Sequence, residues 1–252
     1  MSLSTVKNRM EEMGFHGMLA NLEASLTRVT KGEVSAMEAI DELLETEWRF
    51  RKQKATHGRV SRSKIRPGVS LEDFDFTLLR GVTKAQLRDL SKLDWCDEGK
   101  PLIFIGPTGV GKSYIARSLG LLACEKGRTV LFLSFTDFIE HQALARSSSS
   151  YLKFRDRLVR PDVLILDDLG MRKFSSQEAE DLRDIIEQRS YGKSTVITTQ
   201  LPVDHWGEVF GDQIILDALV DRLDPPGIKI EFGEKTESYR GKKKMETKRS
   251  KE

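Results

Sequence analysis

Apolar residues in the first quarter of the chain recur every three or four positions, which is the spacing of one face of a helix. Two such apolar faces are formed, one by Leu19, Leu22, Leu26 and Val29 and the other by Met37, Ile40, Leu44 and Trp48. Residues 30–32 (T-K-G) separate them, and Ser35 with Glu38 forms a capping box at the start of the second helix. We therefore expect a helical N-terminal domain over residues 1–66, in which Gly58 ends the second helix and residues 61–68 form a basic linker.

From about residue 69 onward, short apolar runs alternate with stretches of helical spacing. The runs that we expect to be strands span residues 101–105, 129–134, 162–167, 194–199 and 228–232. After a helix that Thr83 and Gln86 can cap, the helical stretches span about 112–126, 136–146, 151–159, 176–190, 203–209 and 214–223. Strands that alternate with helices form a parallel sheet covered on both faces. The pattern predicts an α/β domain over residues 67–239, with ligands at the carboxyl ends of its strands.

Charge is distributed unevenly, although the net charge is only +2. Residues 49–66 contain eight Lys and Arg residues and no acid, with Trp48 and Phe50 at the edge of the segment. Residues 240–252, a predicted C-terminal tail, contain seven basic residues and two acids. Basic segments on an otherwise acidic protein favour an anionic polymer as partner, and for residues 49–66 we prefer this to a solvated linker. For the tail, a solvated role is equally consistent with the sequence.

Cysteine and histidine residues give no sign of a metal site. Cys96 and Cys124 lack the spacing of metal ligands, and the four histidines are scattered. Two free thiols fit a reducing compartment, and we expect both to lie in or near the core. The N-terminus has no long apolar segment, so we expect a cytoplasmic protein with no signal peptide and no membrane span.

The strongest motif is G-P-T-G-V-G-K-S at residues 106–113, between the first predicted strand of the sheet and a predicted helix. Its glycines allow backbone N–H groups to surround phosphate oxygens, Lys112 places a charge on the β- and γ-phosphates, and the Ser113 hydroxyl is a ligand for Mg²⁺. The predicted residues of the nucleotide site are Gly106, Pro107, Thr108, Gly109, Val110, Gly111, Lys112, Ser113 and Tyr114.

A second motif places two carboxylates after the apolar run at residues 163–166. In enzymes with this phosphate-binding loop, an acid at that strand tip holds Mg²⁺, so we assign Asp167 to the metal and Asp168 to the attacking water. The alternative, two acids in an ordinary turn, is less favoured because the loop motif requires such an acid downstream.

Three further residues are candidates for contact with the nucleotide. Thr198, Thr199 and Gln200 form the tip of the strand predicted at residues 194–199, and a polar side chain there, such as that of Gln200, could touch the γ-phosphate or the water. Arg222 ends an amphipathic helix, where an arginine is most often a surface ion pair. Beside a nucleotide site, Arg222 is also a candidate arginine finger. Arg240 could reach the nucleotide too, but it adjoins the basic tail.

Taken together, these motifs resemble those of the AAA+ ATPases and, within them, the IstB/DnaC-like family. The segments that carry the resemblance are LEDFDF at 71–76, GPTGVGKSYIARSLG at 106–120, LILDDLG at 164–170, TQLPVDHW at 199–206 and ALVDRL at 218–223. The EWRFR segment at 47–51 is also similar to the family's helical N-terminal region. The resemblance covers nearly the whole chain and is closest to the branch that helps insertion-sequence transposition.

This resemblance implies a five-stranded parallel sheet of order 5-1-4-3-2 and ATP hydrolysis at the interfaces of a homo-oligomer. It also implies non-specific binding of duplex DNA and a transposase as partner. Carried over, Lys112, Ser113 and Asp167 bind ATP and Mg²⁺, and Asp168 is the catalytic acid. Gln200 is the first sensor, and Arg222 is the finger.

The chain departs from the wider AAA+ pattern at two positions, because Asp168 stands where Glu is usual and Gln200 stands where Asn is usual. About twenty residues follow the last predicted strand. This leaves no room for the helical lid of larger AAA+ proteins, so Arg240 is a weak candidate for a second sensor.

Three other functions use the same motifs. A replicative helicase loader of the DnaC type has the same ATPase core and a different partner. A small-molecule kinase also has a phosphate-binding loop, but the paired acids, the distant Arg222 and the missing lid argue against it. A nucleotide-switched binding module would bind ATP without turnover. We therefore expect a DNA-binding ATPase that helps a transposase.

Overall fold

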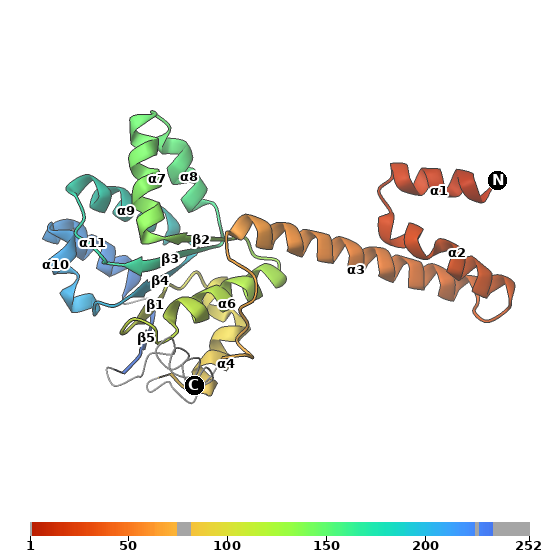
Figure 1. The fold of residues 1–252 in the computed structure, drawn as a ribbon, viewed down its shortest axis with the longest axis horizontal. Coiled ribbons are helices and arrows are strands. Elements are labelled where there is room, and N and C mark those ends of the chain that lie inside the picture. The colour runs from red at the N-terminus through yellow and green to blue at the C-terminus, as the bar shows by residue number, and fades with distance from the viewer. Residues whose placement is uncertain (1, 75–81, 225–226, 234–252) are drawn as a thin grey trace, which may run out of the picture. The chain divides into compact units, whose positions relative to one another are not determined.

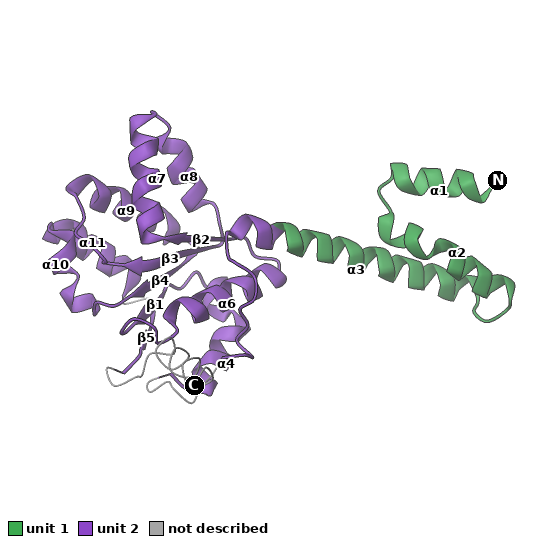
Figure 2. Cartoon of the chain, in the orientation of Figure 1, with its two compact units in different colours: residues 1–58 green, residues 59–252 purple. Residues whose placement is uncertain are grey.

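A computed structural model describes residues 2–74, 82–224 and 227–233. The chain divides into two compact units, residues 1–58 and 59–252, which Figure 2 shows in different colours. This division falls earlier in the chain than the boundary after residue 66 that the sequence suggested. Each unit is described below by itself.

The N-terminal unit consists of helices. They are α1 (Leu3–Glu12), α2 (His16–Thr30) and the first part of α3 (Ala36–Ser63). The predicted break at residues 30–32 is confirmed, because α2 ends at Thr30. The predicted capping box is confirmed as well: the Ser35 amide donates to the Glu38 carboxylate at 2.7 Å, and the Glu38 amide donates to the Ser35 hydroxyl at 3.2 Å.

Close packing between α2 and α3 depends on Gly17 and Glu47. A Cβ atom on Gly17 would lie 2.9 Å from the backbone of both Thr46 and Glu47, so only glycine allows this approach. Phe15 precedes α2 and gives it no side-chain cap. Instead, the buried carboxylate of Glu47 accepts the amide N–H groups of Gly17 at 2.7 Å and Met18 at 3.1 Å. Glu47 thus caps α2 from another helix, a role that the sequence did not reveal.

Helix α3 corrects two predictions. Gly58 does not end it, since the helix continues to Ser63; one helical glycine costs only about 1 kcal/mol, which tertiary contacts can offset. Residues 61–68 are not a free linker either, because Ser63 and Ile65 are buried. The predicted apolar face of Met37, Ile40, Leu44 and Trp48 is at least half exposed, whereas Ala39, Leu43 and Glu47 are buried. Periodicity predicted the helix but not which face the rest of the unit covers.

The second unit is built on a sheet of five parallel strands. They are β1 (Leu102–Ile105), β2 (Val130–Ser134), β3 (Val163–Leu169), β4 (Ser194–Thr199) and β5 (Ile228–Glu231). Their order is β2-β3-β4-β1-β5, with parallel pairing throughout. This confirms the predicted fold class and the predicted order 5-1-4-3-2.

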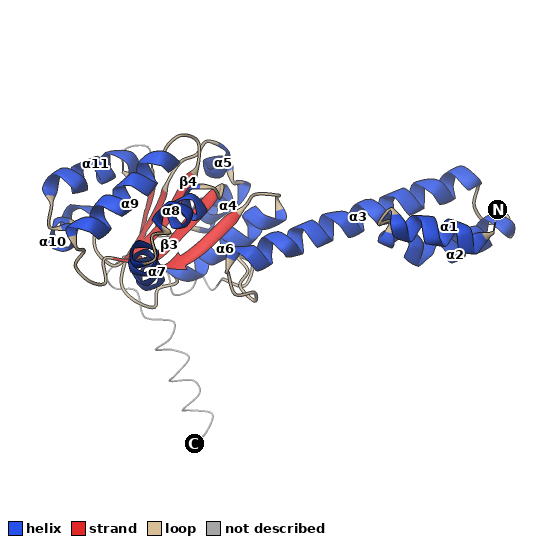
Figure 3. Ribbon diagram, turned by 90° about the horizontal axis from the view of Figure 1, so that it is seen from above, coloured by secondary structure: helices blue, strands red, loops and turns tan. Residues whose placement is uncertain are grey.

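Helices cover both faces of the sheet (Figures 1 and 3). One face carries α7 (Phe135–Ser147), α8 (Tyr151–Val159), α9 (Ser176–Arg189), a 3₁₀ turn at Val203–His205, α10 (Gly207–Phe210) and α11 (Gln213–Leu223). The other face carries α4 (Lys84–Lys92), α5 (Asp94–Asp97) and α6 (Lys112–Glu125). Successive residues of a strand face opposite sides of the sheet. Ile103 therefore packs in the hydrophobic core on one face, and Phe104 packs in the core on the other face. The single helix predicted at residues 203–209 is instead two short helices, Val203–His205 and Gly207–Phe210. The predicted cap at Thr83 and Gln86 is confirmed at the start of α4.

Both cysteines are buried free thiols, as expected, and burial raises the pKa of each to about 11. No helix follows β5 within the described residues, which end there at Gly233. Arg240 and the tail at 240–252 lie outside the described residues. Among the helices in the described ranges, none is long and apolar enough to cross a membrane.

Replacing Glu47 by Ala should loosen the start of α2. The lost cap is worth about 1 kcal/mol, so hydrogen–deuterium exchange at Gly17 and Met18 should accelerate. The matched control is Glu45→Ala, which removes an exposed carboxylate paired with Arg49 and should leave this exchange unchanged. Equal exchange in the two variants would contradict the capping role.

Acid should remove the same stabilisation. Burial alone would raise the pKa of Glu47, but hydrogen bonds from Arg51, Met18 and Gly17 outweigh it and hold the pKa below its ordinary value. The stabilisation is therefore present above the ordinary carboxyl pKa and is lost as the pH falls below about 4. The helical circular-dichroism signal of Glu47→Ala should depend less on pH in this range than that of the unaltered chain.

Candidate functional site

The loop between β1 and α6 has the backbone of a phosphate cradle. The φ angles of Gly106, Gly109 and Gly111 are 154°, 86° and 109°, values that residues with a Cβ atom rarely adopt. Lys112 is the first residue of α6, so the loop leads directly into a helix N-terminus. Backbone N–H groups at such a position attract anions. The structure therefore supports the loop geometry that the sequence predicted.

Lys112 places its charge inside this loop. The side chain is buried, and its ammonium group donates to the carbonyl oxygens of Gly106 at 2.7 Å and Pro107 at 2.9 Å. Burial lowers the pKa of Lys112 below its ordinary value, and the nearby charges of Asp168 and Asp167 oppose this effect. Because the charges of Asp167 and Asp168 act on Lys112, the two acids lie near the Lys112 ammonium group.

Residues 70–74 lie beside the loop. The ring of Phe74 would be 3.0 Å from a Cβ on Gly111, and it packs at 5.7 Å from the ring of Tyr114. The Tyr114 hydroxyl donates to the Ser70 carbonyl at 2.8 Å and accepts from the Ser70 amide at 3.2 Å. The Tyr114 side chain thus holds this segment against α6. Asp75 and Phe76, which belong to the family-like LEDFDF segment, lie outside the described residues.

Asp167 and Asp168 occupy different environments at the tip of β3. Asp167 is 3% exposed, whereas Asp168 is exposed. The pairing of β3 with β4 shifts register between Leu166 and Leu169, and within this bulge Asp168 has a φ of 62°. A left-handed backbone costs a residue other than glycine roughly 1–2 kcal/mol, and such strain often occurs at functional sites.

Thr198 on β4 joins the two acids, a role that the sequence did not reveal although it pointed to this strand tip. Its fully buried hydroxyl donates to Asp167 Oδ1 at 2.6 Å and accepts the amide N–H of Asp168 at 2.9 Å. Of the polar residues at this strand tip, the sequence favoured Gln200 as the contact to the nucleotide. The Gln200 amide instead donates to the sulfur of Met171 at 3.1 Å. Alternation along β4, together with the strand order, could have directed attention to Thr198.

The donor set of this site fits Mg²⁺ bound together with a nucleotide. In the described ranges, no group of three or more His, Cys, Asp or Glu residues could hold a metal ion. Ser113 on α6 and Asp167 on β3 supply one hydroxyl and one carboxylate, and Mg²⁺ usually completes such a set with phosphate oxygens and water. The loop beside them supplies the place for those phosphates.

Arg222 does not join this site within one chain. It lies on α11 and forms an ion pair with Glu187 of α9, with Nε–Oε2 and Nη2–Oε1 distances of 2.8 and 3.3 Å. A second pair links it to Asp221. These contacts match the alternative interpretation, a surface ion pair at a helix end. Arg240, the other basic candidate, lies outside the described residues.

Several cations of the basic segment already have partners. Arg49 pairs with Glu45, Arg51 pairs with Glu47, and Lys52 lies over the Trp48 ring at 4.8 Å. Arg59 donates to the Cys124 carbonyl at 2.8 Å, which fastens the end of α3 to α6. The segment is therefore not one uniform basic surface.

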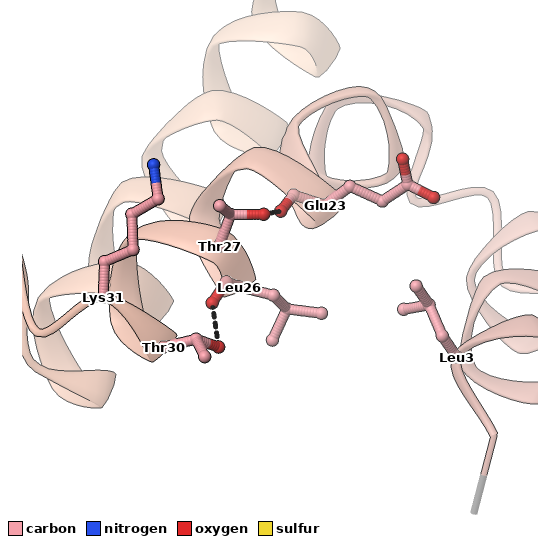
Figure 4. A pocket seen from close by; sticks show the side chains of 6 residues that line it. All are labelled: Leu3, Glu23, Leu26, Thr27, Thr30 and Lys31. Atoms are coloured by element: carbon pink, nitrogen blue, oxygen red, sulfur yellow. Dashed lines mark hydrogen bonds between the residues drawn. The ribbon is translucent and has the colours of Figure 1, made fainter.

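The N-terminal unit has a pocket of about 480 Å³ (Figure 4), lined by Leu3, Glu23, Leu26, Thr27, Thr30 and Lys31. The hydroxyls of Thr27 and Thr30 donate to carbonyls of their own helix. This pocket lacks the converging polar groups of the loop site, and we assign it no function.

Comparisons with known proteins agree with this geometry. The family model described as IstB-like ATP binding protein matches residues 8–247. A Sinorhizobium fredii protein named as an insertion sequence ATP-binding protein, y4pL, is 35% identical over 216 residues, which are 86% of this chain and 88% of that protein.

Solved structures show the same fold at lower identity. The replication initiator DnaA bound to AMPPCP and single-stranded DNA matches with a TM-score of 0.57 and 18% identity. That match covers 73% of this chain and 56% of the DnaA chain. The DnaC helicase loader matches with a TM-score of 0.51 and 23% identity, over 61% of this chain and 93% of that one. The chain therefore belongs to the IstB-like ATP-binding protein family and is an ATPase with the AAA+ fold.

Proposed function

We propose that the protein is an ATP-hydrolysing helper of a transposase that acts on duplex DNA. Its relatives among insertion-sequence ATP-binding proteins support the link with transposition. One structural observation carries the proposal of hydrolysis: Thr198 holds Asp167 and Asp168 beside the loop of Lys112. A cradle that only bound a nucleotide would not need the second, exposed acid.

The residues divide the work as follows. The loop amides and Lys112 hold the phosphates of ATP, and Ser113 with Asp167 would hold Mg²⁺, which would neutralise charge on the phosphate oxygens. Asp168 orients the attacking water and accepts its proton. Its exposed position at the strand tip, close enough to Lys112 to affect its pKa, suits this task.

Two roles require groups from outside the loop. Gln200, which follows β4, acts as a sensor of the γ-phosphate once its contact with Met171 is released. Arg222 acts as a finger on the nucleotide of a neighbouring subunit, because within its own chain it pairs with Glu187 of α9 and with Asp221. Hydrolysis then occurs at the interfaces of an ATP-dependent homo-oligomer.

Thr198→Val should slow ATP hydrolysis while the fold is kept. The variant removes the hydroxyl that donates to Asp167 Oδ1 and accepts the Asp168 amide. Hydrogen bonds to charged groups contribute roughly 1.5–3 kcal/mol, so the rate should fall about 10- to 100-fold. Thr198→Ser keeps the hydroxyl and should stay within a few-fold of the unaltered rate. Nucleotide binding in EDTA, measured in parallel, should not change. A Thr198→Val protein that hydrolyses ATP at full rate would refute the positioning role.

Mixing two inactive variants tests the finger. Arg222→Ala should hydrolyse ATP about 10³- to 10⁵-fold more slowly and keep its affinity for ATP. Lys112→Ala should lose nucleotide binding. In a mixture, some interfaces combine an intact loop with an intact Arg222, so activity should return. Each variant alone at the doubled concentration is the control. If the two variants co-assemble and the mixture remains inactive, Arg222 is only the ion pair seen within the chain.

Partner capture separates transposition from helicase loading. The tagged protein with a non-hydrolysable ATP analogue should retain the transposase of its own insertion sequence and should not retain the replicative helicase of its host. Lys112→Ala should retain less transposase under the same conditions, because the nucleotide-bound form is then missing. Retention of the helicase in place of the transposase would favour the DnaC-type alternative.

A further inference from the structure

A second site lies next to the metal-binding edge of the sheet. It is a pocket of about 460 Å³ in the second unit. Four cationic side chains line it: Lys64 and Arg66, which follow α3, Arg117 on α6 and Arg157 on α8. Phe132 and Ser134 of β2 also line this pocket. Four cations that converge from three parts of the chain make the pocket suited to an anion.

The charges of this pocket are not neutralised from within. Lys64, Arg66 and Arg157 make no hydrogen bond or ion pair among the described residues. The pocket has one acid, Asp137, whose carboxylate accepts the Ser134 hydroxyl at 2.7 Å. The pocket therefore has an excess of positive charge, which in a protein interior or cleft attracts a phosphate group.

Two of these cations are held in place by the backbone. Lys64 and Arg66 stand on either side of Ile65, which is 4% exposed and packs under α6, where its Cδ1 would lie 2.6 Å from a Cβ on Gly120. Burial of Ile65 fastens the segment that carries both cations beside α6, which makes them unlike the charges of a solvated linker.

Arg117 links the pocket to the proposed magnesium site. It lies four residues after Ser113 on α6, and therefore on the same face of the helix. Its guanidinium stacks on Phe132 at 4.5 Å, and its Nη2 lies 3.4 Å from Asp167 Oδ2. Its buried Nε atom has no hydrogen-bond partner. Ser134, in the pocket wall, is paired with Asp167 across β2 and β3.

We propose that this pocket binds a phosphodiester group of the DNA backbone and that Arg117, shared between the pocket and Asp167, couples DNA binding to metal binding. The inference rests on the proposed function, since it assigns a place and a mechanism to the DNA contact. A phosphate in the pocket is a stronger partner for Arg117 than Asp167, whose contact with it is long. The carboxylate is then left to the metal ion.

The coupling must act in both directions. With Mg²⁺ bound at Asp167, the carboxylate would no longer hold Arg117, and the guanidinium would then add its charge to the pocket. Any factor by which DNA raises the affinity for metal is equal to the factor by which metal raises the affinity for DNA. Arg117 is thus a positioning residue and not a ligand of the nucleotide.

The test uses the full chain and a short fluorescent DNA duplex, with a non-hydrolysable ATP analogue and with Mg²⁺ or EDTA at constant ionic strength. Fluorescence anisotropy gives the affinity for DNA, and Mn²⁺ electron paramagnetic resonance gives the affinity for metal with and without DNA. For the unaltered chain we expect each ligand to raise the affinity for the other at least about fivefold, the lower end of typical coupling.

Three variants separate the two parts of the proposal. Arg117→Gln should abolish this coupling and bind Mn²⁺ more tightly without DNA, since Asp167 is released. Arg157→Ala should weaken DNA binding with and without metal, and it should flatten the slope of log affinity against log salt by about 0.9. Arg160→Ala is the matched control, because Arg160 is an exposed residue at the end of the same helix and does not line the pocket.

Each outcome decides one point. Coupling that survives in Arg117→Gln would overturn the role of Arg117, while DNA binding and the proposed function would stand. An unchanged salt slope in Arg157→Ala would overturn the pocket as a phosphate site. If inorganic sulfate, which binds Mn²⁺ only weakly in solution, raises Mn²⁺ affinity as DNA does, the pocket serves a free anion and the assignment to DNA is wrong. Loss of transposase capture in the earlier experiment would count against the proposed function and leave this coupling intact.

Discussion

The hydroxyl of Thr198 is the constraint on which the geometry of the site depends. It donates to Asp167 and accepts from the backbone of Asp168, so one buried group fixes both acids. The hydroxyl gives the Asp168 amide an acceptor at the point where the bulge in β3 interrupts the regular pairing with β4. Through this bond, β4 determines which acid turns inward toward the proposed metal position and which one faces the solvent.

The opposite ends of the same strands are fixed by Arg189. This side chain is completely buried and donates to carbonyl oxygens of Leu158, Pro161 and Ser194 and to the Thr195 hydroxyl. Burial lowers its pKa to about 9, so it stays charged at neutral pH. Backbone carbonyls from α8, the turn before β3 and the start of β4 are thus tied to one guanidinium. Because β3 and β4 are fixed at both ends, the acids at their carboxyl ends have a defined position.

The sequence predicted the features that depend on residues close together in the chain, and it missed those that depend on contacts between distant elements. The strands, their order, the glycine loop and the paired acids were predictable, because local patterns and a family resemblance encode them. Thr198, Glu47 and Arg117 were not singled out for their roles, since each acts on a group from a different element. The extent of α3 past Gly58 was missed for the same reason: burial of Ser63 and Ile65 against the second unit's core outweighs the local preference of glycine.

Lys112, Arg117 and Arg222 share one property, which is that each has a partner it can exchange. Lys112 donates to two neutral carbonyls, Arg117 lies at 3.4 Å from Asp167, and Arg222 pairs with Glu187 at the protein surface. Surface ion pairs add little to stability, and a phosphate oxygen is a better acceptor than a neutral carbonyl. Each cation can therefore turn to a phosphate at small cost to the fold. If Lys112 takes the nucleotide, Arg117 the DNA backbone and Arg222 a neighbour's nucleotide, the three ligands compete for no side chain. Binding of one can then favour binding of the others, which is what the proposed function requires.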